Sequence, residues 1–127
     1  MDTDTGTESR QDLHARYLVA MDAMDAASDQ AIDALRAGTT ARQIMREHLG
    51  AGGRVSDIDR LIEPEAVRAG VSRALSDLER ARHHARRLLF QLLQSEGCTL
   101  TEIGRMWGIS RQLVSRLVNE PAPRSSP

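Results

Sequence analysis

Apolar residues recur at alternating spacings of four and three over long stretches of this chain, which places their side chains on one face of an α-helix. One series begins at Leu13 and a second at Val67. No stretch shows the apolar–polar alternation typical of a half-buried strand. The pattern predicts an all-α protein, and 127 residues are enough for one domain or for two small ones that share a core.

The N-terminal part of the chain is predicted to be a region of helices over residues 9–63. Residues 1–8 are polar and acidic, and we expect them to be disordered. The first helix is predicted from about Ser9 to Ala37, with Gly38 as its C-terminal stop. Its apolar seam consists of Leu13, Tyr17, Ala20, Met24, Ala27, Ala31 and Leu35.

A second, shorter helix is predicted from Thr40 to Leu49, because Thr40 and Gln43 have the spacing of a capping box. Glycines then break the pattern, and a further helical turn is expected over residues 57–62. We expect residues 9–63 to serve dimerisation or the binding of a protein partner.

A long helix is predicted next, from Pro64 to about Glu96, since proline fits the first turn of a helix and only Gly70 interrupts the span. At ~1.5 Å per residue this helix is roughly 50 Å long. Its apolar stripe consists of Val67, Val71, Ala74, Leu75, Leu78, Ala81, Ala85, Leu88, Leu89 and Leu92. Residues 121–127 are rich in proline and serine and are expected to form a disordered tail.

Two short helices joined by a tight turn are predicted between Cys98 and Glu120. Thr99 and Glu102 have the spacing of a capping box at the start of the first helix. Gly108 supplies the left-handed backbone of the turn, and Ser110 caps the second helix. This arrangement is the signature of a helix-turn-helix motif.

The apolar residues of this segment are expected to share one core with the preceding helix. They are Ile103, Trp107, Ile109, Val114 and Leu117. Cys98 is placed to pack on Ile103, and Ile109 on Val114, as hydrophobic staples. Gly104 is small where the two helices cross closely, so a bulky side chain there is expected to push them apart.

The remaining side chains of the second helix are polar, and their types suit the edges of bases in a major groove. Arginine offers paired donors to guanine, and glutamine or asparagine pairs with adenine. With neighbouring positions that suit phosphate contact, the candidate DNA-binding residues are Thr99, Thr101, Ser110, Arg111, Gln112, Ser115, Arg116, Asn119 and Arg87. Residues 64–120 are therefore expected to form a DNA-binding domain made of the long helix and the motif.

The run TEIGRMWGISRQLVSRL resembles the helix-turn-helix of bacterial transcription regulators. It is most similar to the version in the promoter-binding C-terminal region of sigma factors and in small actinobacterial regulators. The resemblance rests on Glu102–Ile103–Gly104, Gly108–Ile109–Ser110 and Arg111–Gln112 and covers about a fifth of the chain. It implies that Ser110, Arg111, Gln112, Ser115 and Arg116 face DNA. Trp107 departs from the smaller aliphatic residue usual at its position.

The charge of the chain is divided unevenly. Residues 1–79 contain 9 arginines and 15 acidic residues, net −6, whereas residues 80–127 contain 8 arginines and 3 acidic residues, net +5. The basic end is expected to meet a polyanion. Arg80, Arg82, Arg86 and Arg87 lie on the helix before the motif, where such a helix often passes the DNA backbone.

Other classes of function find little support in the sequence. No P-loop, dinucleotide fingerprint or HExxH motif is present, so we expect no enzyme, no cofactor and no metal site. No apolar run approaches the ~20 residues of a membrane helix, and the N-terminus does not resemble a signal peptide. The single cysteine, Cys98, suits a reducing cytoplasm, and we expect a cytoplasmic, nucleoid-associated protein.

Three hypotheses stay open at this point. The first is a sequence-specific transcription regulator that binds double-stranded DNA as a homodimer, because one small recognition unit binds weakly. The second is an architectural or adaptor protein, whose N-terminal helices dock a protein partner while the motif anchors it to DNA. The third is a protein-interaction module that binds no DNA. The ratio of specific to random affinity separates the first two.

Overall fold

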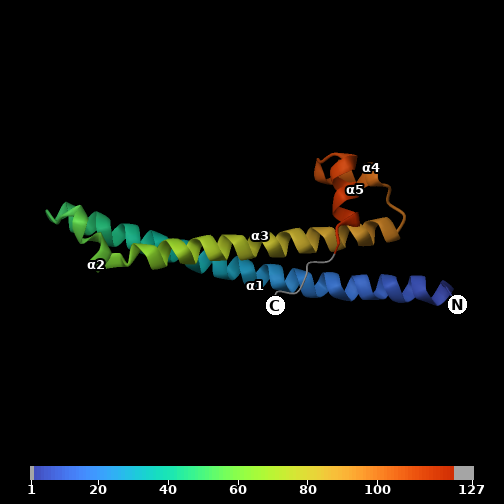
Figure 1. Cartoon of the computed structure of the whole chain (residues 1–127), viewed down its shortest axis with the longest axis horizontal. Coiled ribbons are helices and arrows are strands. Elements are labelled where there is room, and N and C mark those ends of the chain that lie inside the picture. The colour runs from blue at the N-terminus through green and yellow to red at the C-terminus, as the bar shows by residue number, and fades with distance from the viewer. Residues whose placement is uncertain (1, 122–127) are drawn as a thin grey trace. The chain divides into compact units, whose positions relative to one another are not determined.

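The structure, a computed structural model, describes the backbone of residues 2–121 and the side chains of residues 10–121. Its elements are α1 (Asp2–Gly50), the 3-10 helix η1 (Val55–Asp57), α2 (Ile58–Ile62), α3 (Pro64–Ser95), α4 (Leu100–Trp107) and α5 (Arg111–Asn119) (Figure 1). No strand occurs within residues 2–121, so the all-α prediction is confirmed. No helix in that range is long and apolar enough to cross a bilayer.

The chain divides into two compact units. The first joins the part of α1 up to Asp22 with the chain from Arg82 onward, and the second consists of residues 23–81. Both long helices therefore contribute to both units, whereas the predicted boundary lies between residues 63 and 64. Residues 2–8, which the sequence predicts as disordered, lie within α1. The predicted C-terminal tail lies outside the described residues, except for Pro121.

The predicted stop at Gly38 is wrong, because α1 continues unbroken to Gly50. The separate helix from Thr40 to Leu49 is therefore wrong as well, and Thr40 caps nothing. Gly38 is buried on the helix, and it is not among the glycines with positive φ. A glycine inside a helix costs only about 1 kcal/mol relative to alanine, which packing of its buried face can offset.

The buried face of α1 follows the alternation of four and three more strictly than we predicted. After Ala31 the next position in the alternation is Ala34, which is half-buried. Leu35, the predicted seam residue, is instead 49% exposed. On α3 the same correction applies: Leu75 is exposed whereas Ala74 is buried. Ala34 and Ala74 continue the alternation of four and three, whereas Leu35 and Leu75 do not, so the spacing decides the buried face.

In the second unit, a loop reverses the chain between α1 and α3. Gly52 adopts a φ of 88°, and Nε2 of His48 lies 2.7 Å from a carboxylate oxygen of Asp57. This hydrogen bond is the main cause that lowers the pKa of Asp57. A side chain at Gly53 would collide with the imidazole of His48. The predicted turn over residues 57–62 is confirmed as α2, and α3 begins at Pro64 as expected.

In the first unit, the last turns of α3 present two apolar faces. Ala85, Leu88 and Leu92 continue the helix seam and are buried. Phe90 is fully buried in a separate cluster with residues of α4 and α5. Figure 1 shows α4 and α5, in orange and red, lying against this end of α3. The second face explains how two short helices are fixed on a long one.

Candidate nucleic-acid interface

Both short helices begin with the caps that the sequence predicts. The hydroxyl oxygen of Thr99 accepts the N–H of Glu102 at 3.1 Å, and the Glu102 carboxylate accepts the N–H of Thr99 at 2.9 Å. The bond from the Thr99 N–H is the largest cause that lowers the pKa of Glu102. The hydroxyl oxygen of Ser110 accepts the N–H of Leu113 at 3.1 Å. Each cap satisfies N–H groups that the first helical turn leaves unpaired.

The turn between α4 and α5 depends on two glycines. Gly108 ends α4 with a φ of 66°, the left-handed conformation that was predicted. Gly104, one turn earlier, lies against the turn itself, and a Cβ there would stand 2.7 Å from the carbonyl oxygen of Ile109. The N–H of Ile109 donates to the carbonyl of Gly104 at 3.0 Å. The close approach therefore involves the backbone of the turn, rather than the side chains of a crossing helix.

The core beneath the motif contains most of the residues predicted for it. Phe90, Ile103, Val114, Leu117 and Val118 are buried together. Cys98, Ile109, Leu89, Leu93, Leu100 and Leu113 are half-buried against them. Both predicted staples therefore pack on the same core. Because this core includes α3, the motif is held on the long helix as one folded unit.

Trp107 differs from its prediction as a core residue. Its side chain is 43% exposed, and its ring contacts that of Phe90 edge-on with centroids 5.2 Å apart. Its neighbour Met106 is 56% exposed. The tryptophan therefore covers the edge of the core and leaves an apolar surface at the end of α4, which the sequence analysis did not predict.

Most candidate DNA-binding residues of the motif lie on its surface. Thr99 and Thr101 are exposed at the start of α4, and Ser110, Arg111, Gln112, Arg116 and Asn119 are exposed on or beside α5. Ser115 is half-buried. Val114, Leu117 and Val118 are buried on the other side of α5. The helix thus presents a polar face with donors and acceptors that suit base edges and phosphates.

The amide of Asn119 is engaged within α5. Its nitrogen donates to the Ser115 carbonyl at 2.8 Å and lies 3.4 Å from the Ser115 hydroxyl oxygen. Asn119 and Ser115 therefore form one hydrogen-bonded pair at the C-terminal half of the helix. Arg111 and Gln112, at the other end, occupy the first turn, where side chains of a recognition helix reach bases.

Arg87 is placed differently from its prediction as a phosphate contact. It is 4% exposed, and its guanidinium donates to Nδ1 of His84 at 3.2 Å. Spacing places Arg87 on the same side of the long helix as Arg73 and Arg80, opposite the apolar seam. That side is exposed at Arg73 and Arg80, whereas Arg87 is buried in the first unit with its guanidinium on His84. A buried guanidinium cannot contact a phosphate from this position.

The other three arginines of α3 proposed for phosphate contact also have local partners or partial burial. Arg80 is exposed and pairs with Asp77. Arg82 is exposed, and it also interacts with another group of the protein. Arg86 is half-buried, and its Nε is buried with no hydrogen-bond partner among the described residues. The motif itself carries three exposed arginines, Arg105, Arg111 and Arg116.

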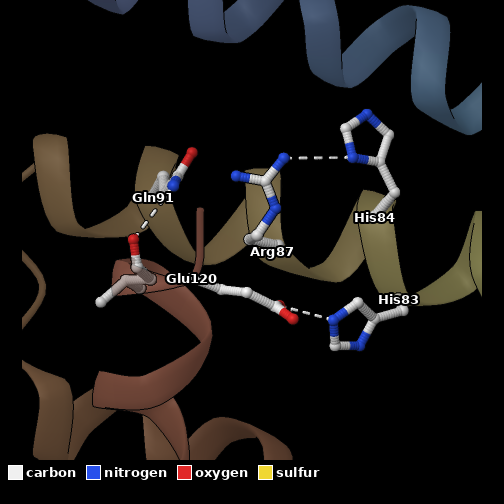
Figure 2. Close-up of polar contacts among 6 residues, drawn as sticks. His83, His84, Arg87, Gln91 and Glu120 are labelled. Carbon is white, nitrogen blue, oxygen red and sulfur yellow. Dashed lines mark hydrogen bonds and ion pairs between the residues drawn. The ribbon is translucent and has the colours of Figure 1, made fainter. Parts of the chain in front are cut away.

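Two contacts between α3 and the end of α5 were missed by sequence reasoning. The amide nitrogen of Gln91 donates to the carbonyl of Val118 at 3.0 Å. Nε2 of His83 lies 2.6 Å from a carboxylate oxygen of Glu120. Figure 2 shows His83 directed toward Glu120 and its neighbour His84 directed toward α1, away from it. No local pattern connects residues that are 27 and 37 positions apart.

Burial and nearby positive charge act on His84. Desolvation is the largest cause that lowers its pKa, followed by Arg87, Arg16 and His83. Arg16 belongs to α1, so the imidazole has cationic groups on two helices of this unit. The residues described contain no group of three histidine, cysteine or acidic side chains that could hold a metal ion.

Comparison with known proteins concerns the same part of the chain. No curated protein and no solved structure matches it. The MarR family matches residues 83–120, which span the last turns of α3 together with α4 and α5 and make up under a third of the chain. The match supports a DNA-binding transcription regulator of the helix-turn-helix type.

Proposed function

We propose that the protein is a sequence-specific transcription regulator that places α5 in the major groove of double-stranded DNA. The observation that carries this proposal is the division of α5 into two faces. Arg111 and Gln112 are exposed in its first turn, whereas Val114 and Leu117 are buried. The capped turn before it fixes which face points outward. The match of the MarR family to residues 83–120 supports a DNA-binding regulator of this type.

The candidate residues take different roles in this complex. Arg111 donates to guanine and Gln112 pairs with adenine, because their side chains match the major-groove edges of those bases. Ser110, Ser115, Arg116 and Asn119 contact further bases or the adjoining backbone. Thr99 and Thr101, at the N-terminus of α4, contact phosphate, as the first helix of such motifs crosses the backbone. Arg87 has no direct contact, since it is buried.

We propose further that the regulator acts as a homodimer in the cytoplasm, at the nucleoid. The apolar seams of α1 and α3 do not support this, because their residues Leu13, Met24, Leu78 and Leu92 are half-buried or buried within one chain. Other apolar side chains of α1 are exposed instead. They include Leu18 and Met21 in the first unit and Ile32 and Leu35 in the second. A second copy that covers these residues would provide the paired recognition helices of a palindromic site.

An adaptor function is the second candidate. It is favoured by the exposed apolar residues of the second unit, Ile32, Leu35 and Leu75, which lie outside the DNA-binding motif. In that case a protein partner covers them, and the motif anchors the assembly to DNA. Such an anchor needs little preference for one sequence.

The deciding experiment selects duplexes from a random library with the full chain and measures the affinity of the best sequence against random DNA. A regulator is expected to prefer its site by ~10³-fold or more. Binding without a preferred sequence supports the adaptor. No binding at low salt contradicts both functions. Sedimentation at tens of micromolar protein tests the homodimer separately, and a monomer contradicts it.

A further inference from the structure

The recognition helix of this protein is short, so few contacts fix its orientation. α5 has nine residues, about 13 Å of helix, and its buried residues are Val114, Leu117 and Val118. Apolar packing is non-directional and tolerates small rotations and shifts. Reading of base edges requires side chains held within ~0.5 Å of the productive geometry. Directional contacts elsewhere on α5 therefore matter for its function.

The hydrogen bond from Gln91 supplies one directional contact. The last carbonyls of a helix lack partners within the helix. In α5 the Leu117 carbonyl accepts the N–H of Glu120 at 3.4 Å, and the Val118 carbonyl accepts the Gln91 amide at 3.0 Å. Gln91 is half-buried on α3, so its amide comes from a fixed support. The bond holds one backbone atom of α5 at a set distance and direction from α3.

The pair of His83 and Glu120 supplies a second directional contact between α3 and the end of α5. Glu120 follows the last residue of α5 directly, and its carboxylate meets an imidazole two turns before Gln91 on α3. His83, Arg87 and Gln91 are spaced by four residues, and so lie along one face of α3 (Figure 2). The C-terminal end of α5 is thus attached to α3 at two separate points. Two points fix rotation about the helix axis, which one point does not.

We propose that Gln91 and His83 are positioning residues for DNA recognition, which set the orientation of α5 by holding its C-terminal end on α3. This inference rests on the proposed function, since it concerns the helix that contacts the bases. The two contacts lie at the opposite end of α5 from Arg111 and Gln112. A rotation permitted at the C-terminal end is transmitted along the rigid helix to these side chains. Base preference depends strongly on that orientation, whereas non-specific attraction to phosphate depends on it less.

The test substitutes Gln91→Met, which keeps side-chain length but removes the donor. Affinity for the selected site is expected to fall about three- to tenfold, the range of one lost hydrogen bond. Affinity for random DNA at low salt is expected to stay unchanged, so the specificity ratio falls. Gln94→Met is the matched control, because Gln94 is exposed on the same helix. Hydrogen exchange of the amides of residues 117–120 is expected to accelerate in Gln91→Met, with or without DNA.

The second contact is tested with a double-mutant cycle. His83→Ala and Glu120→Ala are each expected to lower the specificity ratio, and the double variant to lower it no further, because they remove one shared contact. His83→Gln is expected to restore part of the ratio, since glutamine also donates an N–H to the carboxylate.

The outcomes distinguish this inference from the function on which it rests. A wild-type chain without any preferred site overturns both. A wild-type preference that Gln91→Met and His83→Ala leave intact overturns the positioning role alone. An equal loss of affinity for selected and random DNA, accompanied by a lower melting temperature, also overturns it, because that is the result of a merely structural role.

Discussion

Gly104 and Ile109 meet so closely that a Cβ on Gly104 would stand 2.7 Å from the Ile109 carbonyl oxygen. The neighbour is backbone of the α4–α5 turn, which cannot swing aside as a flexible side chain does. Gly104→Ala is therefore expected to destabilise the fold by about 1–3 kcal/mol, as overpacking of a core does. Denaturant unfolding followed by circular dichroism measures the change.

Gly70→Ala is the matched control for this substitution. Gly70 also lies inside a helix, α3, but an added Cβ there meets nothing within 4 Å. Helix propensity alone then applies, and the variant is expected to be more stable by up to about 1 kcal/mol. Equal stability of the Gly104→Ala and wild-type chains would show that the turn does not approach α4 as described.

Gly108 is the second glycine on which the motif depends, for a different reason. Nothing lies within 4 Å of an added Cβ, but its φ of 66° is strained for any branched residue. Gly108→Val is expected to lower the free energy of unfolding by about 1–3 kcal/mol and to weaken DNA binding as a consequence. Gly108→Asn, which tolerates this conformation better, is expected to lose less. If both variants melt at the wild-type temperature, the left-handed turn is refuted.

The features of the motif that were predictable are those made by neighbours in the sequence. Each of these features is local: Thr99 bonds to Glu102, Ser110 bonds to Leu113, and the glycine of the turn depends on its own backbone angles. Their side chains or backbone angles identify their role without knowledge of the rest of the fold. The prediction for α1 was equally accurate where it followed the spacing. It failed at Leu35, where residue size was used instead of the spacing, and at Gly38, where residue type was used.

The placement of Arg87 could not be predicted in this way. Periodicity identified the main seam of α3, and Arg87 lies outside that seam. Its burial depends on how the helices of the first unit pack around α3, which spacing along α3 alone does not give. The Gln91–Val118 and His83–Glu120 contacts depend on the same packing. A sequence predicts such long-range pairs only when the relative placement of the helices is already known.

His84 makes the stability of the first unit dependent on pH. Its pKa is lowered in the folded state, mainly by burial and then by Arg87, Arg16 and His83, so the folded chain binds fewer protons than the unfolded one. This contribution is present above the ordinary histidine pKa of ~6.5 and is lost as pH falls through the lower folded value. The free energy of unfolding is therefore expected to rise through His84 as the pH increases toward about 6.5 and to change little through this group above it.

His84→Gln isolates this effect, with His14→Gln as the control on an exposed site of α1. The rise of unfolding free energy with pH is expected to be smaller in His84→Gln than in His14→Gln. Asp57 and Glu102, whose pKa values are also lowered, stay ionised in this window and do not contribute to the difference. Identical pH profiles for the two variants would contradict a lowered pKa of His84.

Arg111 is expected to carry part of the base preference of the proposed regulator. It is exposed in the first turn of α5, where its guanidinium matches guanine. Arg111→Ala is expected to cost about 1–3 kcal/mol at the selected site and to relax the preference at one position. Titration against single-base variants of the site measures both. An affinity loss that is uniform across all variants would assign Arg111 to phosphate.

Arg116 and Arg87 give opposite expectations for the dependence of DNA affinity on salt. Arg116 is exposed on α5, and each phosphate contact that is removed lowers the slope of log K against log salt by about 1. Arg116→Ala is therefore expected to reduce the steepness of this slope by about 1 for each phosphate contact that it removes. Its effect on base preference is expected to be smaller than that of Arg111→Ala. Arg87→Met, which replaces a buried side chain by one of similar length, is expected to leave the slope unchanged.

The salt series also tests the division of charge along the chain. Because the basic residues that reach the surface near α4 and α5 carry the attraction, affinity is expected to fall steadily as salt rises.

If Arg87→Met flattens the salt slope as much as Arg116→Ala does, Arg87 leaves its buried position when the protein binds DNA. In that case the contact with His84 at 3.2 Å would have to break, and the pH dependence of DNA affinity would change together with the salt slope.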